Sequence, residues 1–348
     1  MGEDAKHYGI VVLDLSEPAK PRYADVNGAK VQNPASVGKI AVALAIFQAL
    51  ADVYPNDIAA REKLLRDTVV TANRWSQTDH HKVPIWKPGD PSVKWRPIEE
   101  GDQENLWTYL DWMASASSNG AASQLMSELM LLRHFGKEYP VSTERAQAYF
   151  NDTPKSALSK AYLSAMLEPL KRNGLNTEKL RQGGFFTRSG KVRIPGTNSV
   201  ATAGELVHFM MLMEEGKLVD PWSSLEIKRL LYLTDTRIRY AASPALNSSA
   251  LYFKSGSLYS CKDEAGFTCG KYIGNRLNYM NSIAIVEVEE NGRSLHYMVA
   301  ILSNVLKKNS SNIHVGFAKS LHELIESYHA PVEVPAEAPS AAGAAGAP

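Results

Sequence analysis

The chain has 348 residues, of which 44% are hydrophobic and 22% are charged, the balance of an ordinary globular protein. Its formal net charge is +1, which offers no electrostatic footprint for nucleic acid and argues against a nucleic-acid partner. The apolar stretches are interrupted short of the roughly 18 residues that a membrane-spanning helix needs, so we expect no membrane span in this segment. At this length we expect about two domains or one large composite domain.

The first predicted elements are a β-hairpin and a helix. Residues 9–15 form an apolar run typical of a strand, and residues 22–26 form a second short strand after a turn with two prolines. The long apolar run at 40–47 then predicts a helix, and Ser36 and Lys39 stand at its start.

The middle of the chain is predicted to be mostly helical. Residues 75–102 are rich in Pro, Gly and charged residues and are predicted to be an irregular insertion, while residues 182–199 have no usable period and are predicted to be a loop. Helical periodicity predicts helices over residues 57–68, 104–116, 121–135, 142–150, 156–172, 202–215 and 224–233.

Strands return near the end of the chain. They are predicted over residues 250–259, 282–289 and 294–303, with a hairpin turn at 290–293, and an amphipathic helix follows at 313–328. Strands at both ends with helices between them indicate one sheet built from discontinuous segments. We therefore expect an α/β subdomain made of residues 8–66 and 234–329 and a helical subdomain over residues 67–233.

The two ends of the chain suggest a domain cut from a longer protein. Residues 1–6 are acidic and lack the apolar core of a signal peptide. Residues 330–348 are rich in Ala, Pro and Gly without periodicity, which predicts a disordered tail.

The first chemical motif is Ser36-Val37-Gly38-Lys39, the only Ser-x-x-Lys in the chain. Positions i and i+3 share one face of a helix, so Lys39 would come within reach of the Ser36 hydroxyl. Serine is a weak nucleophile until a base takes its proton, and lysine can be that base if burial or nearby cations lower its pKa. The alternative interpretation is an N-cap serine followed by a surface lysine.

The second motif, Ser117-Ser118-Asn119, lies between two predicted helices. Taken alone it could be an ordinary loop, because Asn tolerates turn conformations.

The third motif, Lys254-Ser255-Gly256-Ser257, continues the strand-like run before it. It could be an edge strand interrupted by a glycine. In a functional interpretation, Gly256 lets a substrate backbone approach the strand edge, and Lys254 raises the local positive potential and lowers the pKa of a neighbouring lysine.

Ser-x-x-Lys, Ser-x-Asn and Lys-Ser/Thr-Gly in this order are the signature of the serine penicillin-recognising enzymes. The chain resembles the superfamily of penicillin-binding D,D-peptidases and serine β-lactamases, most closely its class A-like branch, over residues 8–328. The resemblance implies an α/β (α+β) fold, an antiparallel sheet flanked by helices with an inserted all-helical subdomain. It also implies no cofactor, no metal and a periplasmic or extracellular location.

The resemblance assigns a role to each motif. Ser36 would be the nucleophile, Lys39 its base, and the backbone amides of Ser36 and Ser257 the oxyanion hole. Ser117 would relay a proton to the leaving group. Asn119 would hydrogen-bond the base and the substrate amide, and Ser255 would bind the substrate carboxylate.

One part of the class A pattern is missing. Class A β-lactamases carry a glutamate between the second and third motifs that activates the water for release of the acyl-enzyme. Residues 179–204 contain no Asp or Glu, and residues 185–191 are instead basic and aromatic. The nearest alternative is Glu168, which falls in a predicted helix. Without a placed water and base, we expect a β-lactam to acylate Ser36 and remain attached.

We therefore expect a serine hydrolase or acyl-transferase that forms an acyl-Ser36 intermediate on a peptide, amide or ester, similar to a D,D-peptidase. The alternatives are a class A-like β-lactamase with a displaced deacylation base and a penicillin-binding sensor domain that is acylated without turnover. The expected partner is a small-molecule or peptide substrate, with cell-wall peptides and β-lactams as candidates.

Two further groups of residues carry side chains that can bind metal or form a disulfide. Asp79-His80-His81, in the polar insertion, is predicted to be a solvated surface cluster rather than a metal site. Cys261 and Cys269 are the only cysteines, and the sequence leaves open whether they are free thiols in a hairpin loop or a disulfide in an oxidising compartment.

Overall fold

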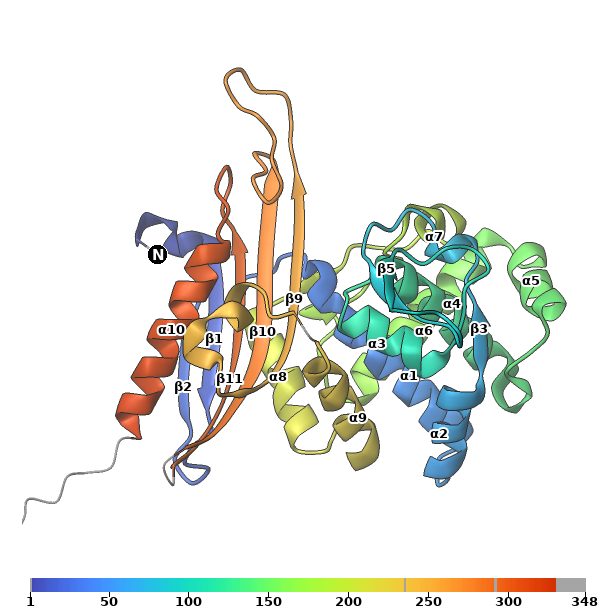
Figure 1. The fold of residues 1–348 in the computed structure, drawn as a ribbon, viewed down its shortest axis with the longest axis horizontal. Coiled ribbons are helices and arrows are strands. Elements are labelled where there is room, and N and C mark those ends of the chain that lie inside the picture. Colours follow the sequence, from blue (N-terminus) through green and yellow to red (C-terminus); the bar gives the residue numbers. More distant parts are fainter. Residues whose placement is uncertain (1, 235, 291–292, 330–348) are drawn as a thin grey trace, which may run out of the picture.

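The computed structural model describes residues 2–234, 236–290 and 293–329, and its core is one antiparallel sheet of five strands in the order β2-β1-β11-β10-β9 (Figure 1). Strand β1, near the N-terminus, pairs with β11, the last strand in the sequence, so segments far apart in the chain meet within the sheet. This confirms the predicted antiparallel sheet of discontinuous segments. The strands are β1 (Tyr8–Asp14), β2 (Arg22–Val26), β9 (Ala250–Ser260), β10 (Leu277–Glu290) and β11 (Arg293–Asn304).

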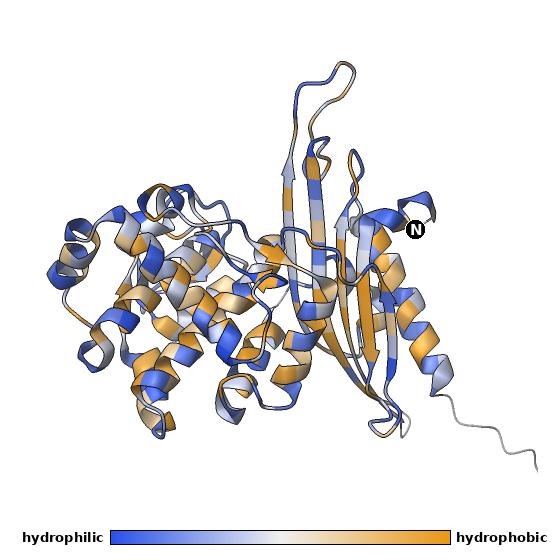
Figure 2. Ribbon diagram, turned by 180° about the vertical axis from the view of Figure 1, so that it is seen from behind, coloured by the Kyte–Doolittle hydropathy of each residue, from blue (hydrophilic) through white to orange (hydrophobic). Residues whose placement is uncertain are grey.

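Helices cover both faces of the sheet. Because side chains alternate across a strand, neighbouring residues of β10 enter different cores. Ala284 packs in a core with residues of α10 (Ser311–Tyr328), whereas Ile283 and Ile285 pack in the core shared with the helical part. On that second face, α8 (Ala203–Glu214) and α9 (Pro221–Tyr232) contact the strands. Figure 2 shows mainly hydrophobic colours in the lower halves of the strands and a mixture of hydrophobic and hydrophilic colours toward the upper end of β10.

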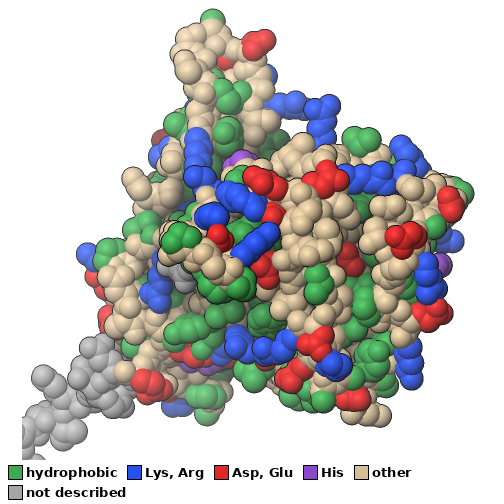
Figure 3. Space-filling view, turned by 45° about the vertical axis from the view of Figure 1, so that its right-hand side comes forward, with side chains coloured by type: hydrophobic (Ala, Val, Ile, Leu, Met, Phe, Trp, Pro, Cys, Tyr) green, Lys and Arg blue, Asp and Glu red, His purple; other side chains and the backbone are tan. Residues whose placement is uncertain are grey.

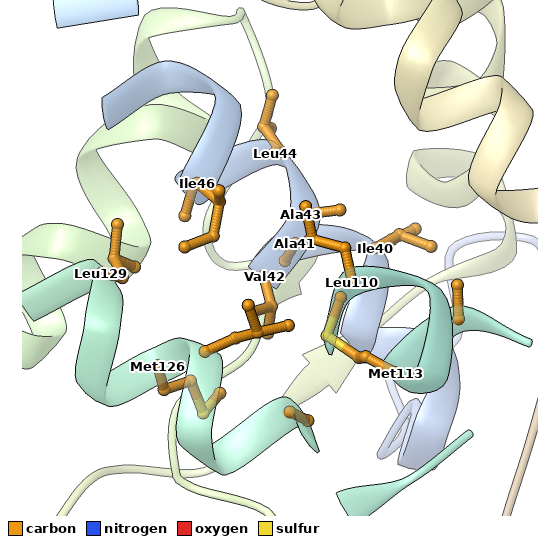
Figure 4. Packing of buried hydrophobic residues seen from close by; sticks show 14 of the residues in the cluster. Ile40, Ala41, Val42, Ala43, Leu44, Ile46, Leu110, Met113, Met126 and Leu129 are labelled. Carbon is orange, nitrogen blue, oxygen red and sulfur yellow. The ribbon is translucent and has the colours of Figure 1, made fainter. Parts of the chain in front are cut away.

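The helical part lies on the far side of α8 and α9 (Figure 1). Its centre is α1, in which every residue from Lys39 to Leu50 is buried. Side chains of α3 and α4 pack against α1, Leu110 and Met113 from the former and Met126 and Leu129 from the latter (Figure 4). The helices are α1 (Lys39–Val53), α2 (Ile58–Asp67), α3 (Leu106–Ala114), α4 (Asn119–Phe135), α5 (Thr143–Asp152), α6 (Lys155–Arg172) and α7 (Arg188–Arg193).

The segment made of α1 and the turn before it bears on the expectation that no part of this chain spans a membrane. By length and composition alone, Ala35–Val53 could cross a membrane, with a mean hydropathy of 1.6. However, 78% of that window is buried inside the molecule, so its apolar surface is already covered by the core. Composition cannot separate a fully buried core helix from a membrane span, and here the packing accounts for the apolar run.

Two segments are more regular than predicted. The insertion at 75–102 contains a small hairpin of β4 (Val83–Ile85) and β5 (Lys94–Arg96), and it is flanked by the paired strands β3 (Val69–Thr71) and β6 (Gln103–Asn105). The loop at 182–199 contains α7 and lies between β7 (Leu180–Arg181) and β8 (Val200–Ala201), which pair with each other. Elements this short leave too little periodicity for a sequence pattern. Two other predictions, the tail at 330–348 and the centre of the turn at 290–293, lie outside the described residues.

A long excursion over residues 261–276 connects β9 to β10 and projects beyond the sheet (Figure 1). A disulfide between Cys261 and Cys269 closes its first half, which resolves the question that the sequence left open. Lys271 and Tyr272, in its second half, return to the body of the molecule and line the cleft described next.

Candidate active site

The three motifs meet in one cleft of about 1000 Å³ between the sheet and the helical part. One wall is the upper part of β9, and the other is the junction of α3 and α4 with the 80–84 loop. Figure 3 shows basic side chains gathered near the base of the projecting excursion. The motif residues that line the cleft are Ser36, Ser117, Asn119, Lys254, Ser255, Gly256 and Ser257.

Ser36 lies in η2 (Ala35–Gly38), the 3-10 turn from which α1 continues. One turn later, Lys39 is only 1% exposed, and its Nζ lies 3.0 Å from Ser36 Oγ. The same nitrogen donates to Asn119 Oδ1 at 2.8 Å and to the carbonyl of Ser117 at 2.7 Å. The second motif therefore fixes the lysine of the first, although 78 residues separate Lys39 from Ser117 along the chain.

The environment of Lys39 favours a neutral amine. Burial is the largest cause, and the positive charge of Lys254 adds to it, so that the pKa of Lys39 falls well below its usual value. The negative charge of Asp79 acts in the opposite direction. A buried lysine with a lowered pKa next to a serine hydroxyl can accept the proton of that hydroxyl.

Ser117 connects Lys39 to Lys254. Lys254 Nζ donates to Ser117 Oγ at 2.8 Å, and Lys39 Nζ lies 3.3 Å from the same oxygen. Ser117 adopts a positive φ of 56°, unusual for a residue with a side chain, and strain of this kind concentrates at functional sites. Burial, and then the positive charge of Arg239, lower the pKa of Lys254 to about 7. A continuous path for a proton thus runs through Ser36, Lys39, Ser117 and Lys254.

Gly256 allows β9 to run directly against the turn that carries Ser36. A Cβ atom at this position would lie 2.6 Å from the backbone nitrogen of Ser36 and 2.8 Å from that of Val37. No side chain fits in this space. The approach places residues 255–257 beside Ser36.

Arg239 was not predicted as a site residue. It begins η5 (Arg239–Ala242), is 6% exposed, and donates from Nη2 to Ser257 Oγ at 3.0 Å. Its positive φ of 55° turns the chain toward the cleft, where its guanidinium also lies 5.2 Å from the ring centre of Tyr272. No local motif marks this arginine, so the sequence carried no signal for it.

The prediction of a solvated surface cluster at Asp79-His80-His81 is wrong for two of its members. The Asp79 side chain is 1% exposed and accepts hydrogen bonds from Ser118 Oγ and from the Gly120 amide, both at 2.8 Å. Burial alone would raise the pKa of Asp79, but the hydrogen bonds from His81, Gly120 and Ser118 outweigh it and hold the pKa well below its usual range. His81 lines the cleft; only His80 is exposed as predicted, and it too borders the cleft.

Two groups of described residues bring His and carboxylate atoms within 4.8 Å of one another, but neither is identified as a metal site. In the first, the Asp79 carboxylate is already bonded to the protein on both oxygens. In the second, the ammonium of Lys228 lies between Glu214 and Glu287, at 2.9 Å and 2.6 Å. The ammonium of this lysine therefore occupies the position that a metal ion would need.

The loop that lacks a carboxylate brings an aromatic ring to Lys39 instead. The Phe186 ring centre lies 4.6 Å from Lys39 Nζ. Glu168 is exposed on α6, whose buried residues face the core. The structure therefore places Phe186, and not Glu168, next to Lys39.

Comparisons with protein-family models find no match for this chain, and a comparison with curated proteins finds none either. Among solved structures, the fold is similar to the TLA-3 extended-spectrum β-lactamase (TM-score 0.59, 14% identity, 93% of this chain and 94% of that one). It is also similar to a β-lactamase from Sphaerobacter thermophilus (TM-score 0.56, 14% identity, 93% of this chain and 92% of that one). A third similar structure is a PBP-A mutant in its acyl-enzyme complex with penicillin G (TM-score 0.56, 14% identity, 92% of this chain and 90% of that one). The predicted fold, an antiparallel sheet flanked by helices, is thereby confirmed as similar to that of these β-lactamases and of PBP-A.

Proposed function

We propose that this chain is a serine hydrolase or acyl-transferase that forms an acyl-Ser36 intermediate on a peptide, amide or ester, in the manner of a D,D-peptidase. The observation that carries the proposal is the 3.0 Å separation between Ser36 Oγ and the buried, pKa-lowered Lys39 Nζ. Lys39 takes the hydroxyl proton while Oγ bonds to the carbonyl carbon of the substrate. Ser117 then passes a proton to the leaving group, whose bond to the acyl carbon breaks.

The rest of the site binds and orients the substrate. The backbone amides of Ser36 and Ser257 stabilise the oxyanion, a contribution of several kcal/mol in other acyl-transfer enzymes, about 2.7–4 kcal/mol for one donor. Ser255, with the positive charges of Lys254 and Arg239 close by, favours a substrate that carries a carboxylate. Asn119 aligns Lys39 and the substrate amide.

The Phe186 loop favours a peptidase over a β-lactamase. Hydrolysis of a stable penicilloyl ester needs a base that holds a water, and residues 179–204 supply an aromatic ring beside Lys39 instead of a carboxylate. A β-lactam is therefore expected to acylate Ser36 and stay. A β-lactamase would show many turnovers of a chromogenic cephalosporin, whereas a peptidase or a sensor would show a single stoichiometric burst.

The compartment follows from the same proposal. The disulfide Cys261–Cys269 is typical of proteins in oxidising compartments, and the resemblance to penicillin-binding D,D-peptidases implies a site of action outside the cytoplasm. We propose a periplasmic or extracellular location and a cell-wall peptide as the substrate.

Covalent labelling tests the nucleophile and its base. The protein is incubated with a fluorescent penicillin and its intact mass is measured. Ser36→Ala should show no adduct while keeping its circular dichroism, because a hydroxyl at a helix start contributes at most about 1–2 kcal/mol to stability. Lys39→Ala should acylate ~10²–10⁴-fold more slowly, as catalytic-base variants generally do. An adduct on Ser36→Ala, or a Lys39→Ala rate within a few-fold of the parent, would contradict the assignment.

The lifetime of the adduct separates the peptidase from the β-lactamase. In the parent protein the mass shift of one penicillin should persist well beyond labelling, and Glu168→Gln should leave this lifetime unchanged, because Glu168 points to solvent. Phe186→Glu, which adds a carboxylate beside Lys39, should shorten it. Rapid clearance by the parent that is lost in Glu168→Gln would restore the β-lactamase with a displaced base.

A further inference from the structure

The cleft contains a second pair of titratable side chains that the acylation step does not use. His81 Nδ1 lies 2.6 Å from Asp79 Oδ1, and the His81 ring is partly exposed into the same cleft as Ser36 and Ser117. The other oxygen of Asp79 accepts from Ser118 and Gly120 at the start of α4. The carboxylate is therefore anchored to the residue that follows Ser117, and it fixes the histidine in turn.

The hydrogen bond defines the protonation of the ring. An ionised carboxylate can only accept, so Nδ1 carries the proton and Nε2 keeps its lone pair. Burial is the main cause that lowers the pKa of His81 below 6.5; Asp79 raises it, while Lys39 and His80 lower it further. Asp111 of α3 and Lys254 of β9 line the same cleft. At neutral pH the ring is uncharged and can accept a proton.

We propose that the Asp79–His81 pair activates the acyl acceptor in the second half of the reaction, with His81 as the general base and Asp79 as the residue that positions it. This inference rests on the proposed acyl-Ser36 intermediate. It supplies the base that residues 179–204 lack, and it does so from the side of the site on which Ser117 lies.

In this second half of the reaction, the acyl group passes from Ser36 to the acceptor. His81 Nε2 takes the proton of the acceptor, a water or an amine, while the acceptor oxygen or nitrogen bonds to the acyl carbon. The resulting tetrahedral intermediate collapses by breaking the bond between the acyl carbon and Ser36 Oγ. Ser36 Oγ takes its proton back from Lys39 Nζ, which is resupplied through Ser117, while the imidazolium of His81 releases its proton to the solvent of the cleft.

The position of the pair also fits a long-lived β-lactam adduct. Ser117 delivers a proton to the leaving group, so the leaving group departs on the side where His81 lies. An acyclic leaving group diffuses away and vacates this space for the acceptor. The leaving nitrogen of an opened β-lactam stays tethered to the acyl chain and occupies it. We therefore expect turnover of acyclic substrates and trapping of β-lactams by the same site.

The test uses an acyclic thioester of an N-acyl-D-alanine, whose thiol release is followed by absorbance. A burst equal to the enzyme concentration reports acylation of Ser36, and the steady state that follows reports transfer to water. In the parent, the steady-state rate should rise with pH through a midpoint below 6.5, as the His81 ring loses its charge. His81→Gln should keep the burst and lower the steady-state rate ~10²–10⁴-fold with loss of that pH dependence.

The matched control is His134→Gln, an exposed histidine at the far end of α4, which should leave both phases and the pH profile unchanged. Asp79→Asn should keep the burst and lower the pH midpoint of the steady state, because the Asp79 carboxylate raises the pKa of His81. A normal burst with an unchanged steady state in His81→Gln would overturn this inference and leave the proposed function standing. A parent that gives neither a burst nor penicillin labelling would refute the proposed function itself.

Discussion

The chemistry of the site depends on how single residues are buried. Ser36 and Lys39 could be predicted because their spacing alone brings them together on a helix. Asp79, Arg239 and Phe186 could not, because each contacts a site residue that is distant from it in the sequence. Asp79 in particular reads as part of a polar stretch, and only its hydrogen bonds to Ser118 and Gly120 explain its burial.

The two lysines predict a pH dependence in opposite directions. Lys39 must be neutral to act as a base, and its lowered pKa means that the acylation rate rises with pH through that value and is lost in acid. Lys254 must be charged to attract a carboxylate, and with a pKa of about 7 it loses its charge above that pH. We expect KM for a substrate with a free carboxylate to increase above about pH 7.

The measurement compares that substrate with its amidated analogue between pH 5 and 9. The analogue should show no such increase in KM, because it carries no carboxylate for the charge of Lys254 to attract. An equal increase for both compounds would remove Lys254 from carboxylate binding.

At the scale of elements, the decisive contact is β9 against the turn η2. Gly256→Ala should slow acylation by at least ~10²-fold and destabilise the fold by about 1–3 kcal/mol, because the methyl group must displace the backbone of Ser36. Penicillin labelling kinetics and thermal unfolding measure the two effects. Gly316→Ala is the control: it lies within α10 with open space around its Cβ position, so labelling should be unchanged.

The strongly periodic elements could be predicted, and the weakly periodic ones could not. Helices such as α4 and α6 begin and end within about two residues of the prediction, because their apolar spacing persists over several turns. The hairpin of β4 and β5 and the short α7 were missed, because three to six residues give no usable period. These missed elements lie next to Asp79 and Phe186 in the chain, so the sequence was least informative about the segments that bring these two residues to the site.

At the scale of the whole molecule, the disulfide excursion is separate from the core. Cys261→Ser together with Cys269→Ser should expose residues 261–276 to limited proteolysis while Ser36 is still labelled, because neither core cluster includes this segment. Mass analysis of the fragments and fluorescence of the labelled band would show this. Loss of labelling together with cleavage would mean that the excursion holds the cleft in shape.

The burial of α1 has a consequence for how the site responds to stress. Local openings of a protein involve its loosely packed segments, whereas its best-packed helices exchange their amide hydrogens only in the rarest openings. The buried run from Lys39 to Leu50 belongs to the second kind, and the reactive serine sits at its tip. Ser36 should therefore be among the last parts of the molecule to lose its geometry, after the loops around the cleft. Heating should loosen the borders of the cleft before it separates Ser36 from Lys39.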